Sequence, residues 1–174
     1  MSGKSALKVE VIEATEADRE LRAHLNAWFG EQFGHIPYVW ADPEQYVLAA
    51  LDDQPAGMLV IVSRNVSVGK QRITVGGIGG VVMRPELRGL GIATAMLNKA
   101  GEFIKHTLGA DFGLLICRRE VAPVYAKLGW VRVSGPTTFQ QPAGRVTYPH
   151  DTMVFKCSDR EWPDGPIDLC GLPW

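Results

Sequence analysis

Residues 82–93, with the sequence VMRPELRGLGIA, combine small residues and positive charge in a pattern that can bind an anion. An apolar strand is predicted up to Met83, Pro85 ends it, and a helix is predicted to begin at Ile92. The first turn of a helix carries free backbone N–H groups, and the helix dipole favours negative charge there. Small residues at 89, 91 and 93 let a ligand approach this backbone, and Arg88 adds a permanent charge. The segment therefore predicts a pyrophosphate site, with an ordinary strand-to-helix turn as the alternative.

Strands and helices are predicted to alternate along the rest of the chain, which indicates a mixed α/β fold. The clearest helix is 92–108, and an earlier one, which Thr15 is predicted to cap, has an apolar face that includes Leu25 and Phe29. Residues 30–45 predict an irregular loop, and residues 157–174 a tail that crosses the surface. The predicted strands are 8–13, 58–62, 72–83, 112–117, 131–133 and 152–156. A turn is predicted at Asn65, and residues 66–68 are a predicted extension of the second strand beyond it.

Four glycines, at positions 76, 77, 79 and 80, fall inside the strand that precedes the predicted anion site. Glycine weakens an ordinary strand, so this group predicts a bulge or the close approach of a ligand or another backbone. The segment matches the dinucleotide pattern G-x-G-x-x-G poorly, because it would lie within a strand and not after one.

Two motifs in this order resemble the acyl-CoA signature of the GNAT superfamily of N-acetyltransferases. Residues 88–93, RGLGIA, match R-x-x-G-x-A, and residues 122–130 carry Tyr125 on a helix that ends in Gly129-Trp130. The resemblance implies the GNAT fold, a mixed central sheet that is splayed at the acetyl-CoA site and flanked by helices. It also implies one acyltransferase domain over residues 1–174, with core motifs at 72–133 and a C-terminal hairpin and acidic tail at 134–174.

The same resemblance implies roles for individual residues. The splayed strand end, Val81 to Met83, would pair with the pantetheine arm, and the N–H of Val82 or Met83 would polarise the thioester carbonyl and stabilise the oxyanion. Tyr125 would give a proton to the leaving thiolate, unless it is a core tyrosine. The pyrophosphate of acetyl-CoA would be held by Arg88 and by the backbone of Gly89, Leu90, Gly91, Ile92 and Ala93.

The acceptor is an amine that these motifs do not specify. Features outside the core are similar to the aminoglycoside 2'-N-acetyltransferases, although this chain has Gly79 where those enzymes often have an acid. Asp168 and the other acids of the tail, with the carboxylate of Trp174, would attract a polycation if the tail covered the cleft. Another small amine, a protein amine and a non-catalytic acyl-CoA-binding module are the alternatives. The alternative for the tail acids is that they lie on a solvated surface and do not contact the acceptor.

A general base for the acceptor ammonium is sought among four residues. Glu31 and His35 fall in the segment that roofs the acceptor site in this family, and His150 and Asp151 lie near the final hairpin. Aromatic residues in the same segment, which include Trp40, would stack on a sugar or cation, or form core beneath the loop.

Composition excludes several classes of protein. The net charge of −1 argues against a nucleic-acid binder, and no apolar run approaches the length of a membrane span. The first ten residues lack the apolar core of a signal peptide, and the three cysteines lack metal-type spacing. We therefore expect a reduced, cytoplasmic, metal-free protein with buried thiols and no covalent acyl-cysteine. Homodimers are common in the superfamily, and the sequence does not decide the oligomeric state.

Overall fold

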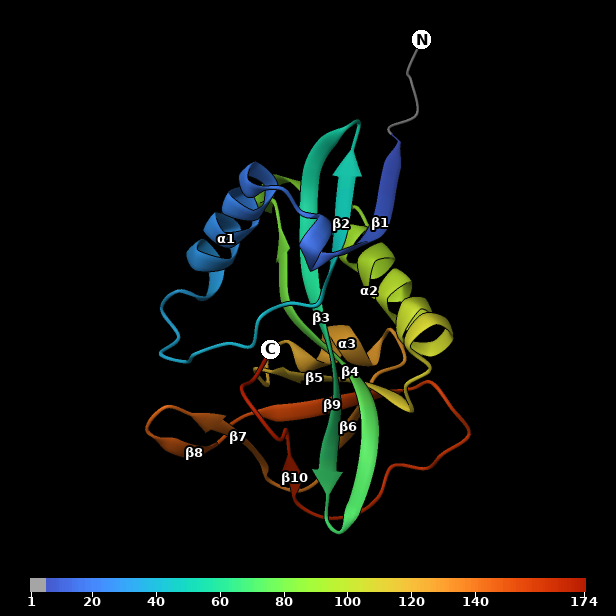
Figure 1. The fold of residues 1–174 in the computed structure, drawn as a ribbon. Helices are drawn as coiled ribbons and strands as arrows, with labels where there is room; N and C mark the ends of the chain where they lie inside the picture. The colour runs from blue at the N-terminus through green and yellow to red at the C-terminus, as the bar shows by residue number, and fades with distance from the viewer. Residues whose placement is uncertain (1–5) are drawn as a thin grey trace.

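A computed structural model describes residues 6–174 of the chain (Figure 1). Within residues 6–174, three α-helices and ten strands follow one another in a mixed order, as the α/β prediction requires. The helices are α1 (Arg19–Phe33), α2 (Ile92–Phe103) and α3 (Ala122–Ala126). The strands are β1 (Leu7–Glu13), β2 (Gln45–Leu51), β3 (Gln54–Val68), β4 (Gln71–Met83), β5 (Phe112–Cys117), β6 (Val131–Val133), β7 (Thr137–Gln141), β8 (Gly144–Thr147), β9 (Asp151–Lys156) and β10 (Ile167–Asp168).

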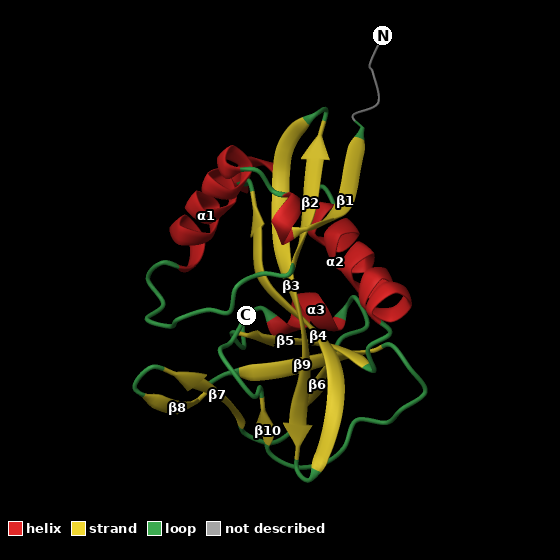
Figure 2. Cartoon of the chain, viewed as in Figure 1, coloured by secondary structure: helices red, strands yellow, loops and turns green. Residues whose placement is uncertain are grey.

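The strands form one mixed sheet with two differently built halves (Figure 2). In the first half β1, β2, β3 and β4 pair antiparallel in chain order. In the second half β5 pairs parallel with β4, and β9 and β6 follow antiparallel. The short strand β10 joins the far end of β3 to the β7–β8 hairpin. The parallel β4–β5 pair therefore connects the two halves.

Helices α1 and α2 cover opposite faces of the first half of the sheet. Met58 and Val60 of β3 pack in the cluster that includes Leu25 of α1. Leu59 and Ile61, which alternate with them, pack in the cluster of α2. Successive side chains of a strand point to opposite faces, so each helix buries one face of the same strand.

Some helix and strand boundaries differ from the sequence prediction. Asp18, and not Thr15, caps α1, because its carboxylate accepts the N–H of Leu21 at 2.8 Å. Strand β3 runs without a break through Asn65, which pairs with Thr74 of β4, so the turn predicted at Asn65 is wrong. Helix α2 ends at Phe103 and continues as a π-helical turn, Ile104–Leu108.

The end of the predicted tail is buried where the sequence predicted a surface crossing, whereas residues 158–166 are half-buried or exposed. Ile167, Leu169 and Trp174 are at most 3% exposed and pack against Val66 and Phe112. The Arg64 guanidinium fixes this segment, since it donates to the carbonyls of Leu169 at 3.2 Å and Leu172 at 2.7 Å. The prediction failed because the apolar residues of the tail are separated by prolines and glycines and show no helix or strand period.

Among residues 6–174, no helix is long and apolar enough to span a membrane.

Candidate active site

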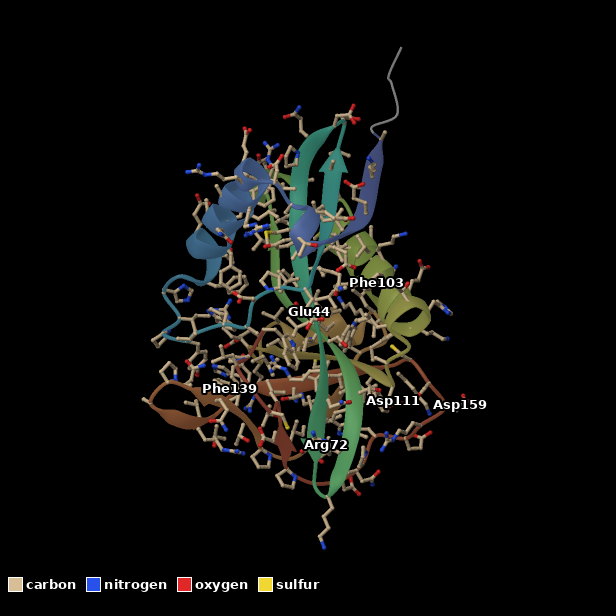
Figure 3. All side chains as sticks on the ribbon, viewed as in Figure 1. Glu44, Arg72, Phe103, Asp111, Phe139 and Asp159 are labelled. Atoms are coloured by element: carbon tan, nitrogen blue, oxygen red, sulfur yellow. The ribbon has the colours of Figure 1, made fainter. Side chains whose placement is uncertain are left out.

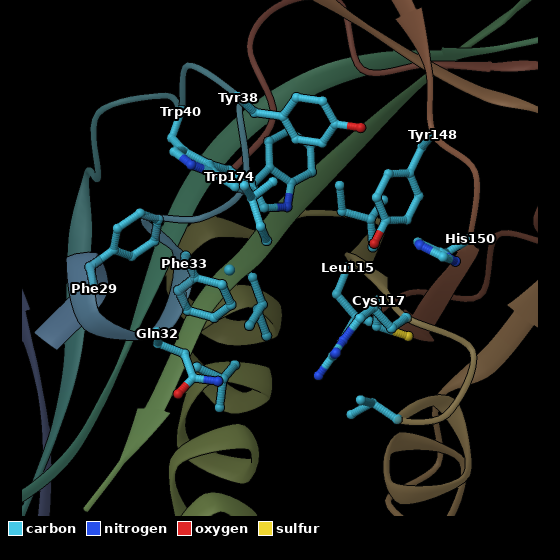
Figure 4. A pocket seen from close by; sticks show the side chains of 18 of the residues that line it. Phe29, Gln32, Phe33, Tyr38, Trp40, Leu115, Cys117, Tyr148, His150 and Trp174 are labelled. Atoms are coloured by element: carbon cyan, nitrogen blue, oxygen red, sulfur yellow. The ribbon is translucent and has the colours of Figure 1, made fainter.

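The parallel pair β4–β5 separates part-way along its length. Pairing is confined to Val75–Gly77 on β4 and Phe112–Leu114 on β5. Beyond these residues the two strands diverge, and a cavity of about 420 Å³ opens between them (Figure 4). Ile78 to Val81 of β4 and Leu115 to Cys117 of β5 line it. Backbone groups at such a splayed edge are available to a ligand.

A β-bulge turns the backbone of β4 at the cavity. Gly80 and Val81 together stand opposite Leu59 of β3, because the register passes from Val60–Gly79 to Met58–Val82. Gly80 has φ +56°, a left-handed conformation that favours glycine. The extra residue of a bulge is released from the ladder. The bulge predicted from the four glycines is therefore present, and it exposes the backbone of Gly80 and Val81 beside the cavity.

Val82 faces away from the cavity. The N–H of Arg84 donates to Ala56 of β3 at 3.0 Å, and hydrogen-bonded pairs alternate along an antiparallel ladder. The backbone N–H of Val82, which stands opposite Met58, therefore also points toward β3. Its side chain is buried in the α1 cluster. The geometry disagrees with a polarising role for the Val82 N–H and leaves the amides of Val81 and Met83 on the other side of the strand.

The predicted anion site forms an open loop before α2. Gly89 and Gly91 adopt φ +82° and +78°, and no atom lies within 4 Å of the position that a Cβ would take at either residue. Helix α2 has no side-chain cap, and residues 88–91 are exposed. Ile92 is buried in the core, so only its backbone is available to a ligand. These features fit the pyrophosphate of an acyl-CoA.

Tyr125 of α3 lines the same cavity as the bulge of β4. Its side chain is 9% exposed, and the cavity is lined by it. Burial, with a smaller contribution from Cys117, raises the pKa of Tyr125 to about 12. The phenol is therefore protonated at neutral pH and can act as a proton donor. Helix α3 ends at the turn predicted from the sequence, with Gly129 at φ +89° and the N–H of Trp130 bonded to the Tyr125 carbonyl at 3.2 Å.

Cys117 also lines the cavity, at the end of β5. Burial, together with the neighbouring Asp151, raises the pKa of the Cys117 thiol to about 11. The thiolate is the nucleophilic form of cysteine, and it is scarce at neutral pH with such a pKa. The side chain therefore suits a wall of the cavity better than a covalent carrier of the acyl group.

The wall opposite β5 is aromatic. Phe29 and Phe33 come from the last turns of α1, and Tyr38 and Trp40 from the loop that follows (Figure 4). Tyr148 and His150, which lie together before β9, face them across the cavity, and His35 also lines it. The sequence prediction gave Phe29, Phe33, Tyr38 and Trp40 as candidates for stacking on a ligand, and favoured the alternative that they form core beneath the loop. The spacing along the chain could not show which rings share a wall.

Three acids considered from the sequence lie elsewhere. Glu31 is exposed on α1 and does not line the cavity. Asp168 forms an ion pair with Arg145 of the hairpin and accepts the N–H of Cys170 at 2.9 Å. Asp151 is buried and pairs with Arg132 at 2.9 Å. No acidic side chain of the tail, and not Asp151, therefore lines the cavity, whereas Trp174, whose main-chain carboxylate lies against Gly79, does.

Trp174 fills the wedge between the diverging strands. Its indole N–H donates to the Leu114 carbonyl of β5 at 3.3 Å, and its ring lies against Gly77 of β4, where a Cβ would come within 2.0 Å of it. The Arg64 guanidinium lies 5.0 Å from the centre of the ring. Because Gly79 also contacts the Trp174 backbone, the close approach predicted from the glycines of β4 is made by the tail.

We expect Trp174→Ala to lower the free energy of unfolding by about 3–5 kcal/mol, the usual cost of removing a buried large aromatic side chain. Urea denaturation of the full chain measures this loss. Trp28→Ala is the matched control, because Trp28 is half-buried on α1, packs at the edge of the α1 cluster beside His24 and does not line the cavity. Equal losses for the two variants would contradict a wedge role for Trp174.

The sequence family agrees with this geometry. Residues 14–133 match the Acetyltransferase (GNAT) domain, which is more than half of the chain. The chain belongs to the GNAT family. The family is that of acetyltransferases, which supports acyl transfer from acyl-CoA to an amine.

Individual proteins are similar to this chain in part of its sequence or in its fold. The GNAT domain is 28% identical over 91 residues to an aminoglycoside 2'-N-acetyltransferase of Mycolicibacterium fortuitum, a match that spans 52% of this chain and about half, 46%, of the relative. The crystal structure of Escherichia coli ElaA superposes with a TM-score of 0.63 at 14% identity, over 87% of this chain and all of that chain. The Escherichia coli GNAT protein YhbS, solved in complex with CoA, superposes with a TM-score of 0.58 at 15% identity, over 95% and 89% of the two chains.

Proposed function

We propose that this GNAT domain transfers the acetyl group of acetyl-CoA to a primary amine of a small molecule by direct attack. The observation that carries the proposal is that the bulge of β4 and Tyr125 line one cavity. An acceptor nitrogen in this cavity would lie between a backbone donor and a proton donor. Both are needed when an amine displaces a thiol.

The N–H of Val81 is the proposed donor to the thioester oxygen. The bulge releases it from β3, and Val81 lines the cavity. The amine lone pair forms the new C–N bond, and the Val81 N–H stabilises the oxyanion that develops. As the C–S bond breaks, the Tyr125 hydroxyl donates its proton to the thiolate sulfur. The amide product and free CoA then leave.

The acceptor reaches the cavity as an ammonium and must first lose a proton. His35 and His150 are the imidazoles among the residues that line the cavity, and either can receive it directly or through water. Arg88 and the first-turn amides of α2 are proposed to hold the pyrophosphate, and the backbone of Met83 to pair with the pantetheine arm.

An aminoglycoside 2'-amine is the second candidate acceptor. It is supported by the relative of that name, whose similarity covers about half of this chain. Asp168, one of the groups expected to favour a polycation, pairs with Arg145 outside the cavity, which weakens this candidate. The Trp174 carboxylate, the other expected group, lies at the cavity against Gly79.

Thiol release from acetyl-CoA, followed with a panel of amines, tests the proposed function. We expect release that depends on an amine and a product heavier than the amine by one acetyl group in the mass spectrum. Heat-inactivated protein is the control for spontaneous hydrolysis. Tight binding of acetyl-CoA without acetyl transfer to any amine would support the non-catalytic alternative instead.

A further inference from the structure

The acceptor side of the cavity carries a continuous group of rings, Phe29, Phe33, Tyr38 and Trp40, which we call the aromatic wall (Figure 4). The ring centres of Phe29 and Phe33 lie 5.0 Å apart, and those of Phe29 and Trp40 lie 5.7 Å apart with planes at 82°. Tyr38 continues the group at 5.9 Å from Trp40. All four side chains are half-buried, so part of each ring is free to contact a ligand.

The aromatic wall is fixed by the rest of the fold, in part by Phe139 of β7, which Figure 3 labels. Tyr38 packs on the fully buried Phe139 of β7, with ring centres 5.0 Å apart. The backbone of Val39 exchanges two hydrogen bonds with the Gln141 side chain, at 2.8 and 2.9 Å. The N–H of Ala41 donates to the Pro173 carbonyl at 2.7 Å. A wall held in this way can select a ligand by shape, because its side chains lose little conformational freedom on binding.

None of the described residues that line the cavity has an acidic side chain, and Arg118 is the one that has a permanently charged side chain. The main-chain carboxylate of Trp174, which lies against Gly79, adds one negative charge. Several acids in the adjoining segments have partners elsewhere. Asp151 pairs with Arg132, Asp168 pairs with Arg145, and Glu44 accepts the N–H of Ser63. A ligand with several ammonium groups would leave water here with a single counter-charge, which is costly. A single amine avoids this cost, since it must become neutral to attack.

The aromatic wall is also next to the reacting centre. A Cβ at Gly80 would lie 3.1 Å from the Phe29 ring, so the wall touches the bulge itself. A group seated against Phe29 therefore lies beside Val81. An amine joined to that group by a short chain would reach the thioester carbonyl without any enlargement of the cavity.

We infer that the acceptor is a primary monoamine joined by a short linker to a flat apolar ring, an arylalkylamine in chemical class, and not a polyamine. The inference rests on the proposed acetyl transfer and specifies its substrate. The tilted and edge-on rings of the aromatic wall suit a planar ligand ring, because aromatic pairs prefer offset and edge-to-face contacts. They also attract the ammonium before it loses its proton.

Initial rates with four amines test this inference on the full chain. The amines are 2-phenylethylamine, 2-cyclohexylethylamine, spermidine and an aminoglycoside with a 2'-amine. We expect kcat/KM for 2-phenylethylamine to exceed that for spermidine and for the aminoglycoside by at least about 10-fold, and that for the cyclohexyl analogue by a smaller factor. A higher kcat/KM for spermidine or the aminoglycoside overturns the inference and leaves acetyl transfer standing.

Two variants of the acceptor side separate ring contact from charge. Trp40→Ala should raise KM for 2-phenylethylamine about 10-fold and leave KM for acetyl-CoA unchanged, whereas Trp28→Ala should change neither. Gln32→Glu places a carboxylate in the cavity and should shift the kcat/KM ratio toward spermidine about 10-fold. An unchanged KM in Trp40→Ala would overturn the role of the aromatic wall.

Calorimetric titration of 2-phenylethylamine into the protein with CoA distinguishes the two failures. Binding that Trp40→Ala weakens, without thiol release from any amine, overturns the proposed transfer but supports the ligand class. Thiol release with some other amine, without binding of 2-phenylethylamine, overturns the ligand class alone.

Discussion

Tyr125→Phe is expected to lower kcat about 100-fold, which is within the range for loss of one general acid. The substitution removes a hydroxyl from a side chain that is 9% exposed and keeps the ring that packs 6.3 Å from Trp130. KM for acetyl-CoA should change little, since the hydroxyl acts on the leaving sulfur and not on the pyrophosphate. Steady-state kinetics with saturating amine measure both constants, and a burst experiment shows whether chemistry limits turnover.

The pH profile adds an independent test of Tyr125. A general acid is active in its protonated form, so activity is lost as pH rises through its pKa. Burial raises the pKa of Tyr125 to about 12, whereas an unperturbed tyrosine titrates near ~10. We therefore expect kcat of the wild type to show no loss from tyrosine ionisation between pH 8 and pH 10, at the upper end of which an unperturbed tyrosine would be about half ionised.

Tyr46→Phe is the matched control for Tyr125→Phe. Tyr46 is 4% exposed on β2 and packs in the α1 cluster, away from the cavity. Its loss should leave kcat within about 2-fold of the wild type, because a substitution away from the site acts on stability alone. If Tyr125→Phe kept full turnover with chemistry limiting, Tyr125 would be a core tyrosine and another group would protonate the thiolate.

Local signals in the sequence were sufficient for the parts of the site that lie on one segment. The loop at 88–91 and the turn after α3 depend on glycines that adopt positive φ, and such positions can be recognised from residue type. The glycines of β4 likewise marked the bulge and the close approach of another backbone. Tyr125 was predicted as a site residue because residues 122–130, with a helix that ends in Gly129-Trp130, resemble the second GNAT motif.

The acceptor side could not be derived in the same way, because its contacts join distant segments. The aromatic wall is held by Phe139, Gln141 and Pro173, all about a hundred residues or more further along the chain. Trp174 is held in the wedge by a tail that Arg64 fixes through two hydrogen bonds. No periodic pattern in the tail records these contacts, so a surface crossing was predicted.

The choice among Val81, Val82 and Met83 also needed the register. One extra residue in a strand reverses which backbone groups face the partner strand, and a run of apolar residues does not show where that residue is. The pairing of Val82 with Met58 turns its N–H toward β3, and Val81 is proposed over Met83 as the donor because it lies at the bulge and lines the cavity.

Gly80→Ala is expected to lower kcat about 100-fold, the usual effect of losing one oxyanion donor. Alanine disfavours φ +56°, and its Cβ would press on the Phe29 ring at 3.1 Å. Both effects favour relaxation of the bulge, which would move the Val81 N–H away from the thioester oxygen. The same change would displace one ring of the aromatic wall, so KM for the amine should rise as well, while KM for acetyl-CoA should change less.

Gly109→Ala separates this effect from backbone strain. Gly109 has φ +61° and is exposed after the π-helical turn, with no atom within 4 Å of the added Cβ. Both alanine variants should lose about 1–2 kcal/mol of unfolding free energy, since both place alanine in the left-handed region. Only Gly80→Ala should lose turnover. If both variants retained kcat at equal loss of stability, the backbone at the bulge would not stabilise the oxyanion, and the amide of Met83, on the same side of β4, would be the donor to test next.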